Sequence, residues 1–425
     1  MSVLAALEKA SIGIQTKPPQ NDEPFPHGSF HEAAARELFH EPLDSDDTLT
    51  DKLKCYGTHE QLLGALNKNE IAMAVIAIDN TVSGRVPTAI EALRDQKLRI
   101  IGKVTISVAQ HILRHPDTPI DTIVQVVSQK PALDQASAWL ELNEITPLSR
   151  SDTVGSAREV ALKQGVIDNK PTAAIASILA GSANGLSIGE QVSPRGNATT
   201  FWLVEKTDQP TDSPEVSEDQ PRHAALYFDV PNVPGKLFEI VGILSDAGYD
   251  LVDIDCHLNS HRSVRSFFTE IDLGNHTEVD LSNTLAVIPS EFNVDLRGVY
   301  TDSTKQEVKS AAIKHRGKAD VSADTLWNGR HGLEHDEEAP VLYIQAKNQP
   351  GSLKGMLEIL NDFGINIVDM SRPYAPEHEN GRGFYFVLPV EANIIAALHQ
   401  LKLGGYVAEE FVYQSNALAA RNESQ

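Results

Sequence analysis

Hydroxyl and amide side chains gather in polar turns of the first 204 residues, where they could bind an anion or donate a proton. Ser128 and Thr153 each precede an apolar helical pattern, a position at which hydroxyl side chains commonly cap helices. A helix start also presents free backbone N–H groups and the positive end of the helix dipole to an anionic ligand. The sequence therefore predicts either helix caps or an anion site at these turns, and both remain open.

Motifs for other chemistries are absent from the sequence. It contains no phosphate-binding loop, no dinucleotide glycine fingerprint, no Gly-x-Ser-x-Gly and no CxxC. His27 and His31 lie four residues apart beside Glu32 without a third ligand, so we predict neither a metal nor a cofactor. Cys55 and Cys256 cannot build a disulfide framework, and we therefore expect a cytoplasmic protein.

Length and charge restrict the possible partners. A chain of 425 residues corresponds to two or three domains. The 59 Asp and Glu residues outnumber 36 Lys and Arg, and the resulting net charge of −23 disfavours binding to nucleic acid or to an anionic membrane. The stretch Thr172–Leu186 is too short and too rich in Ala, Ser and Gly for a membrane span, and it is typical of a packed helix.

Strands and helices alternate along residues 1–204, which predicts an α/β domain that positions the polar turns. The predicted strands are Ser11–Thr16, Ala72–Ile78, Leu98–Ser107, Thr122–Ser128, Thr172–Ser177 and Thr200–Val204. The predicted helices are His31–Leu38, Ala89–Leu93, Leu133–Leu140 and Ser156–Gln164.

The rest of the chain contains an internal repeat. Asn232-Val-Pro-Gly-Lys-Leu237 recurs 116 residues later as Asn348-Gln-Pro-Gly-Ser-Leu353. In each copy the periodicity predicts the order strand, helix, strand, strand, helix, strand, which is a compact α+β fold. We therefore expect a first copy over residues 222–301 and a second over 339–415. An acidic linker (205–221), a charged linker (302–338) and a tail (416–425) separate and follow them.

Six polar motifs of the first domain occur in an order that resembles the prephenate dehydratase family. They are Pro26–Ala34 (PHGSFHEAA), Ala77–Val86 (AIDNTVSGRV), Val127–Gln135 (VSQKPALDQ), Thr153–Ala157 (TVGSA), Ala173–Leu186 with its AAIAS and GL, and Asn197–Phe201 (NATTF). The resemblance implies a two-lobed, periplasmic-binding-protein-like domain with its site between the lobes. It also implies a lyase that converts prephenate to phenylpyruvate, CO₂ and water in phenylalanine biosynthesis.

The resemblance implies roles for individual residues. Thr199 matches the proton-donating threonine of the family's N-x-T-R-F segment, and Thr153 and Asn80 are the other predicted catalytic residues. The predicted substrate-binding residues are Ser29, Thr81, Ser128, Asn197 and Phe201.

Four positions depart from the family pattern. Phe25, His31, Gln129 and Thr200 stand where the family has Gly, Ser, His and Arg. The arginine matters most, because its planar fork suits a carboxylate and threonine carries no charge. The candidates to replace that charge are Arg195, Lys103, Arg85 and Lys130.

The repeat resembles the ACT domain, an amino-acid-sensing module of metabolic enzymes. The second copy keeps the turn Gly351-Ser352-Leu353 and the segment Ser371-Arg372-Pro373, which the resemblance implies hold L-phenylalanine or a related amino acid as effector. The first copy lacks an equivalent of Ser-Arg-Pro, so we predict that only the second copy binds. The resemblance also implies a homo-oligomer, either a dimer or a tetramer.

Two other functions remain open at this point. The altered motifs are compatible with a prephenate decarboxylase that keeps the ring hydroxyl, although a retained Thr199 favours elimination. They are also compatible with a non-catalytic protein whose ACT domains still sense an amino acid.

Overall fold

The computed structural model comprises two compact units, and each is described by itself. The first combines residues 1–218 with 302–315, and the second combines 219–301 with 316–425. The residues whose structure is described are 11–16, 18, 25–40, 49–81, 84–86, 89, 98–194, 196–207, 222–258, 263–304, 338–347, 351–367, 369–371, 381–388 and 394–414. The predicted linkers lie mostly outside these ranges, and the predicted tail and most of the predicted helix Ala89–Leu93 lie outside them too.

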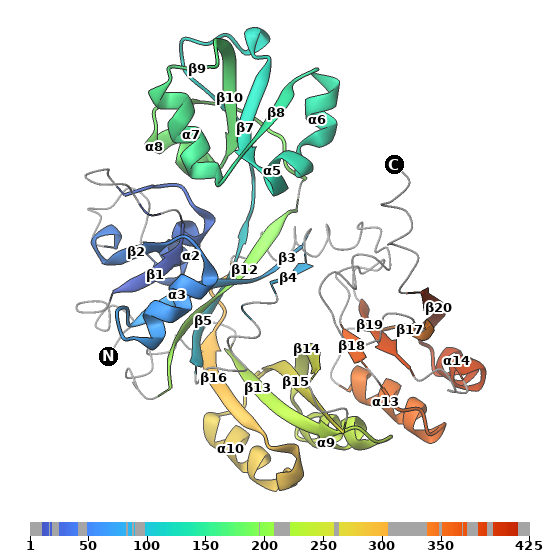
Figure 1. Cartoon of the computed structure of the whole chain (residues 1–425). Helices are drawn as coiled ribbons and strands as arrows, with labels where there is room; N and C mark the ends of the chain where they lie inside the picture. The colour runs from blue at the N-terminus through green and yellow to red at the C-terminus, as the bar shows by residue number, and fades with distance from the viewer. Residues whose placement is uncertain are drawn as a thin grey trace. The chain divides into compact units, whose positions relative to one another are not determined.

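The first unit contains two lobes, each built on its own sheet (Figure 1). The strand order of lobe 1 is β2 (Leu53–Tyr56), β1 (Ile12–Gln15), β3 (Met73–Asn80), β12 (Ala198–Lys206) and β5 (Leu98–Ser107), with β4 (Gly84–Arg85) beside β3. Helices α2 (Phe30–Leu38) and α3 (His59–Asn67) pack on this sheet. Since β1, β2 and β3 are parallel, their carboxyl ends share one edge, where α2 and α3 begin.

Lobe 2 has the strand order β11 (Ser187–Gln191), β6 (His111–Arg114), β10 (Lys170–Ala176), β7 (Gln125–Gln129) and β8 (Thr146–Arg150), and β9 (Val166–Ile167) pairs with β10. Its helices are α5 (Lys130–Gln135), α6 (Ser137–Leu142), α7 (Thr153–Leu162) and α8 (Ile178–Ala183).

Two extended crossings join the lobes, from β5 into β6 and from β11 into β12. They hydrogen-bond to each other through Val108 N to Asn197 O (2.8 Å) and Val192 N to Gln110 O (2.8 Å).

The prediction of a helix over Thr172–Leu186 was wrong for most of that stretch. Residues Lys170–Ala176 form the central strand β10, and only Ile178–Ala183 is helical. β10 lies between β6 and β7 and its residues from Thr172 onward are buried, so it carries small and apolar residues without alternation. The alternative prediction of a strand over Thr172–Ser177 is therefore confirmed.

The second unit has the predicted element order in both copies of the repeat. The first copy consists of β13 (Arg222–Pro231), α9 (Lys236–Asp246), β14 (Asp250–Leu258), β15 (Val264–Asp272), α10 (Glu278–Val287) and β16 (Asp295–Thr301). The second consists of β17 (Glu338–Lys347), α13 (Ser352–Asp362), β18 (Asp369–Ser371), β19 (Gly381–Val387), α14 (Ile394–Leu403) and β20 (Val407–Gln414). Asp255 of β14 pairs with Ser371 of β18, which joins the copies into one eight-stranded sheet over a common apolar core.

Candidate functional site

Asn80 organises the polar group at the carboxyl edge of the lobe 1 sheet. Its Nδ2 lies 2.8 Å from Asn197 Oδ1, 3.1 Å from Ala198 O and 2.8 Å from Thr199 Oγ1. Because a backbone carbonyl only accepts, the Ala198 contact fixes this atom as the amide nitrogen. Thr199 Oγ1 therefore accepts a hydrogen bond from Asn80, which leaves the Thr199 proton to be donated elsewhere.

Two further contacts fix the same turn. Thr81 Oγ1 donates to Gly196 O (3.1 Å) and accepts from Ala198 N (2.9 Å), while Asn197 Nδ2 donates to Gln135 Oε1 (3.0 Å) at the end of α5. Asn197 and Thr81 are buried, whereas Thr199 is half-buried. The structure thus brings together Asn80, Thr81, Asn197 and Thr199, which were predicted from motifs more than 100 residues apart in the chain. The Gln135 contact was not anticipated.

Thr200 faces the opposite side of β12 from Thr199. Thr199 pairs with Asn80 and Ile106, whereas Thr200 pairs with Asp79 and Thr105. Directly paired residues share a face of an antiparallel sheet, and successive residues alternate between faces. Accordingly, the Thr200 hydroxyl lies 2.9 Å from Thr105 Oγ1 and not beside Thr199.

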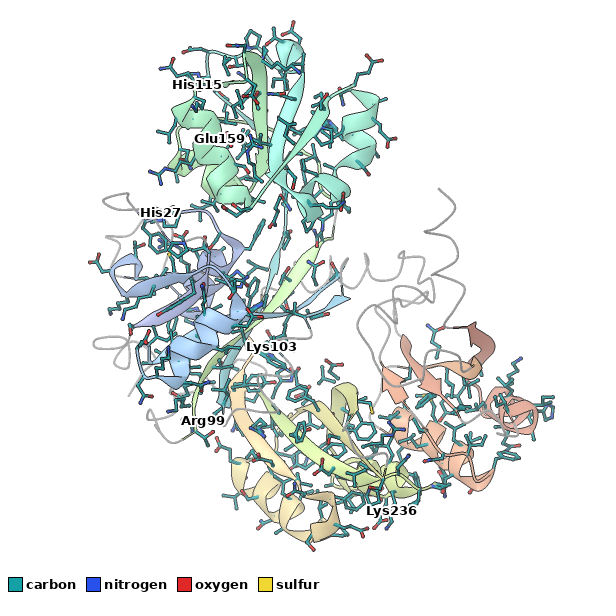
Figure 2. All side chains as sticks on the ribbon, in the orientation of Figure 1. His27, Arg99, Lys103, His115, Glu159 and Lys236 are labelled. Carbon is teal, nitrogen blue, oxygen red and sulfur yellow. The ribbon has the colours of Figure 1, made fainter. Side chains whose placement is uncertain are left out.

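The candidates to replace the missing arginine are differently placed. Lys130 is 75% exposed and forms an ion pair with Asp134 at 2.8 Å, a solvated surface role. Lys103, labelled in Figure 2, pairs with Trp202 and so lies on the Thr200 face of the sheet. Arg195 and the side chain of Arg85 lie outside the described residues. Arg195, two residues before Asn197, therefore remains the candidate nearest in sequence to the Asn80 group.

The predicted caps Ser128 and Thr153 do not cap their helices. Ser128 Oγ donates to Ile175 O (2.6 Å) inside lobe 2, and α5 begins after Gln129. The N-cap of α7 is Asp152, whose carboxylate accepts from Gly155 N, and Thr153 is the first helical residue. A carboxylate is a better cap than a flanking hydroxyl here because it complements the positive end of the helix dipole.

Ser29 is the N-cap of α2, with its Oγ accepting from Glu32 N at 3.0 Å. The buried Glu32 carboxylate in turn accepts from Gly28 N (2.8 Å), Arg36 Nη2 (2.9 Å) and His27 Nδ1 (2.9 Å). Burial pushes the Glu32 pKa upward, but these hydrogen bonds outweigh it and the pKa is lowered. Glu32 therefore stays ionised and holds the turn before α2.

His31 packs against Phe201, with ring centroids 4.9 Å apart. Its Nε2 is buried without a hydrogen-bond partner among the described residues. Burial and the neighbouring His59 lower the pKa of His31 to about 3. Phe201, predicted to bind substrate, is fully buried in the lobe 1 core.

The two lobes touch at the turn before α2. Ser177, the N-cap of α8, donates from Oγ to Gly28 O (2.7 Å) and accepts from Ala180 N (3.0 Å). Gly28 has φ +115°, and a Cβ there would lie 2.4 Å from Ala180 Cα. Both residues occur in the family-like motifs, but the contact between them was not predicted.

The two sheets and the two crossings that join them fit a two-lobed α/β domain of the periplasmic-binding-protein type. Residues 26–209 match the family model described as prephenate dehydratase. This part of the chain is therefore similar to the members of that family. No helix among the described residues is long and apolar enough to cross a membrane.

Individual relatives agree with this assignment. A bifunctional chorismate mutase/prephenate dehydratase of Aquifex aeolicus is 26% identical over 208 residues, covering 48% of this chain and 53% of that protein. The chain thus spans about half of that relative. A prephenate dehydratase of Lactococcus lactis is 24% identical over 290 residues, which cover 67% of this chain and 98% of that protein. A prephenate dehydratase from Arthrobacter aurescens, solved with L-Phe, has the same fold (TM-score 0.54, 21% identity, 69% of this chain and 90% of that one).

The second unit contains a pocket between the two copies of the repeat. Its walls come from the first copy's turn and strands and from the end of α13 with the following loop. They are Val230, Pro231, Asn232, Val233, Gly235, Leu237, Phe238, Arg265, Phe267, Leu357, Leu360, Asn361, Ile365, Asn366 and Ile367. Asn366 Nδ2 donates to Asn232 Oδ1 (2.9 Å) across it. The Ser371 side chain, Arg372 and Pro373 lie outside the described residues, and Leu353 is buried in the core.

Proposed function

We propose that residues 26–209 convert prephenate to phenylpyruvate, CO₂ and water, with Thr199 as the proton donor. The observation that carries this proposal is the 2.8 Å hydrogen bond from Asn80 Nδ2 to Thr199 Oγ1. It makes Thr199 an acceptor toward Asn80 and directs the hydroxyl proton away from it. A positioned acid of this kind needs to lie within hydrogen-bond reach of the leaving oxygen.

Apart from this proton, the reaction requires only that the protein hold the substrate in place. The bond between the ring and its carboxylate breaks to release CO₂, and its electron pair completes the aromatic ring as the C–O bond breaks. The departing oxygen takes the Thr199 proton and leaves as water, and solvent returns a proton to Thr199. Asn80 holds Thr199 in place and is itself held by Asn197. Thr81 fixes the turn before Thr199, and Ser29 caps α2. Thr153 lies at the start of α7, and Ser128 joins β7 to β10 in lobe 2.

Incubating the full chain with prephenate tests this proposal. We expect phenylpyruvate, followed by its ultraviolet absorbance, and a fall in turnover of about 10²- to 10⁴-fold in Thr199→Val with Thr199→Ser as the matched control. A product one water heavier than phenylpyruvate would indicate decarboxylation with retention of the hydroxyl. A folded chain with no product that still binds an amino acid would indicate a sensor.

We further propose that the two copies of the repeat are ACT domains and that their shared pocket binds L-phenylalanine or a similar amino acid. Arg265 supports this, because its Nε is buried without a hydrogen-bond partner among the described residues and it lines an otherwise largely apolar pocket. A guanidinium with an apolar wall suits a carboxylate that carries a hydrophobic side chain. The relative solved with L-Phe supports the ligand class. We place the enzyme in the cytoplasm as a homo-oligomer.

Calorimetric titration of the full chain with L-phenylalanine tests the effector site. We expect Arg265→Met to weaken binding at least ten-fold, because it removes the charge and keeps an apolar stem of similar length. Lys354→Met is the control, since Lys354 also lies on the second unit but pairs with Asp246 and does not line the pocket. Equal weakening by both variants, or no heat with the wild type, would contradict the assignment.

A further inference from the structure

The chain leaving the first copy of the repeat forms an isolated bridge with the edge strand β5 of lobe 1. Directly after β16 ends at Thr301, Asp302 forms a parallel bridge with Lys103 of β5, and Ser303 N donates to Lys103 O at 2.9 Å. Asp302–Thr304 belong to the first unit, although most of the chain around them belongs to the second or lies outside the described residues. We call Asp302–Thr304 the edge segment.

Thr304 makes the contact that extends furthest toward the site. Its Oγ1 accepts from Thr105 N at 2.7 Å and donates to the Asp302 carboxylate, which also accepts from Thr304 N at 3.0 Å. The carboxylate thereby fixes the direction of the hydroxyl, because an ionised carboxylate only accepts. Asp302 and Thr304 are both buried, so water does not readily replace these bonds.

From Thr105 the connection reaches the first residues of β12. Thr105 Oγ1 lies 2.9 Å from Thr200 Oγ1, and Thr200 directly follows the proposed proton donor. The contact anchors β12 from one face, while Asn80 holds Thr199 on the other. Where the family has an arginine, this chain thus has a threonine that continues a hydrogen-bonded chain from the edge segment.

We propose that Thr304 is a positioning residue for Thr199, acting through Thr105 and Thr200. The expected effect on turnover rests on the proposed function. The expected ordering of the Thr105 amide by Thr304 does not. Loss of the Thr304 hydroxyl frees the Thr105 amide and loosens the start of β12, so the acid is held less often at the leaving oxygen. Misplacement of a catalytic group lowers turnover more than it lowers substrate affinity.

The test compares Thr304→Val, which keeps the shape and removes the hydroxyl, with Thr304→Ser, which keeps the hydroxyl. Ser303→Ala is the control within the edge segment, because Ser303 contributes a backbone bond. For Thr304→Val we expect faster hydrogen exchange at the Thr105 amide and a kcat reduced on the order of 10-fold, with KM nearly unchanged. Thr304→Ser and Ser303→Ala should resemble the wild type in both.

Unchanged exchange at Thr105 in Thr304→Val, or faster exchange with an unchanged kcat, would overturn the proposal. So would an equal loss of kcat in Thr304→Ser. If Thr304→Val does not fold, Thr200→Val replaces it, with the same loss of kcat expected and a normal kcat as the refuting result. A wild type that forms no phenylpyruvate refutes the proposed function, whereas the exchange experiment still decides whether Thr304 orders Thr105.

Discussion

Replacing Asn80 by aspartate reverses the hydrogen bond on which the proposed acid depends. The substitution keeps the shape of the side chain but puts an acceptor oxygen where Nδ2 now faces Asn197 Oδ1, Ala198 O and Thr199 Oγ1. The carbonyl of Ala198 cannot adapt, since it has no proton to give. Thr199 can adapt, but only by turning its own proton toward the new carboxylate and away from the substrate.

The expected magnitudes follow from this geometry. An unsatisfied buried acceptor costs about 1–3 kcal/mol, so we expect Asn80→Asp to lower the free energy of unfolding by about 2–3 kcal/mol in urea titrations. Turnover of prephenate should fall by about 10²- to 10⁴-fold, the range for loss of a positioned acid. Asn80→Ala should lose less turnover, because it leaves the Thr199 proton free.

A double variant separates this explanation from general damage. Asn80→Asp and Thr199→Val remove the same proton from the reaction, so the double variant should be little slower than the slower single variant. If the fold-loss of turnover in the double variant equals the product of the two single losses, the two residues act independently. Turnover of Asn80→Asp within three-fold of the wild type would refute the role of this hydrogen bond altogether.

Two other predictions concern the turn before α2 and the helix that follows it. Unfolded His31 takes up a proton near pH 6.5 but folded His31 only near pH 3, so the unfolded chain binds more protons between these values and stability falls as pH is lowered. Relative to pH 8, this removes about 2 kcal/mol at pH 5, and urea titrations should show that part of the loss disappear in His31→Phe. Gly28→Ala places a Cβ 2.4 Å from Ala180 Cα at φ +115°, so we expect the contact between the lobes to break and kcat/KM for prephenate to fall at least ten-fold. A Gly28→Ala enzyme with normal kcat/KM would mean that this contact is not needed in the reactive state.

Sequence periodicity was sufficient for elements that bury one regular face. The predicted strand Leu98–Ser107 matches β5, and both copies of the repeat have the predicted order of elements. Periodicity failed where a buried strand has no alternation of polar and apolar residues, and where elements were short. The predicted helix Leu133–Leu140 is instead two short helices, Lys130–Gln135 and Ser137–Leu142, and the four-residue strand Leu53–Tyr56 was missed because it is a partly exposed edge strand.

The site could be predicted as a set of residues but not as a set of contacts. Motif order identified Asn80 and Thr199, which are 119 residues apart in the chain. In the structure Asn80 Nδ2 lies 2.8 Å from Thr199 Oγ1. The same comparison treated Thr200 as a carboxylate position, because a motif gives residue types without the face that each side chain occupies. Thr304 fell within the predicted charged linker 302–338, and nothing local indicates that such a segment pairs with a distant strand edge.

The pairing of the two repeats changes the question of which copy binds an effector. From the sequence, a copy was predicted to bind the effector only if it retains both the Gly turn and the Ser-Arg-Pro segment. In the structure, β14 and β18 lie side by side, and the pocket combines the first copy's turn at Asn232–Leu237 with the second copy's loop at Ile365–Ile367. In the effector site that we propose, neither copy therefore needs both motifs. The proposed effector site takes Arg265 from the first copy and Ile365–Ile367 from the second, so a chain that lacks either copy would lack this pocket.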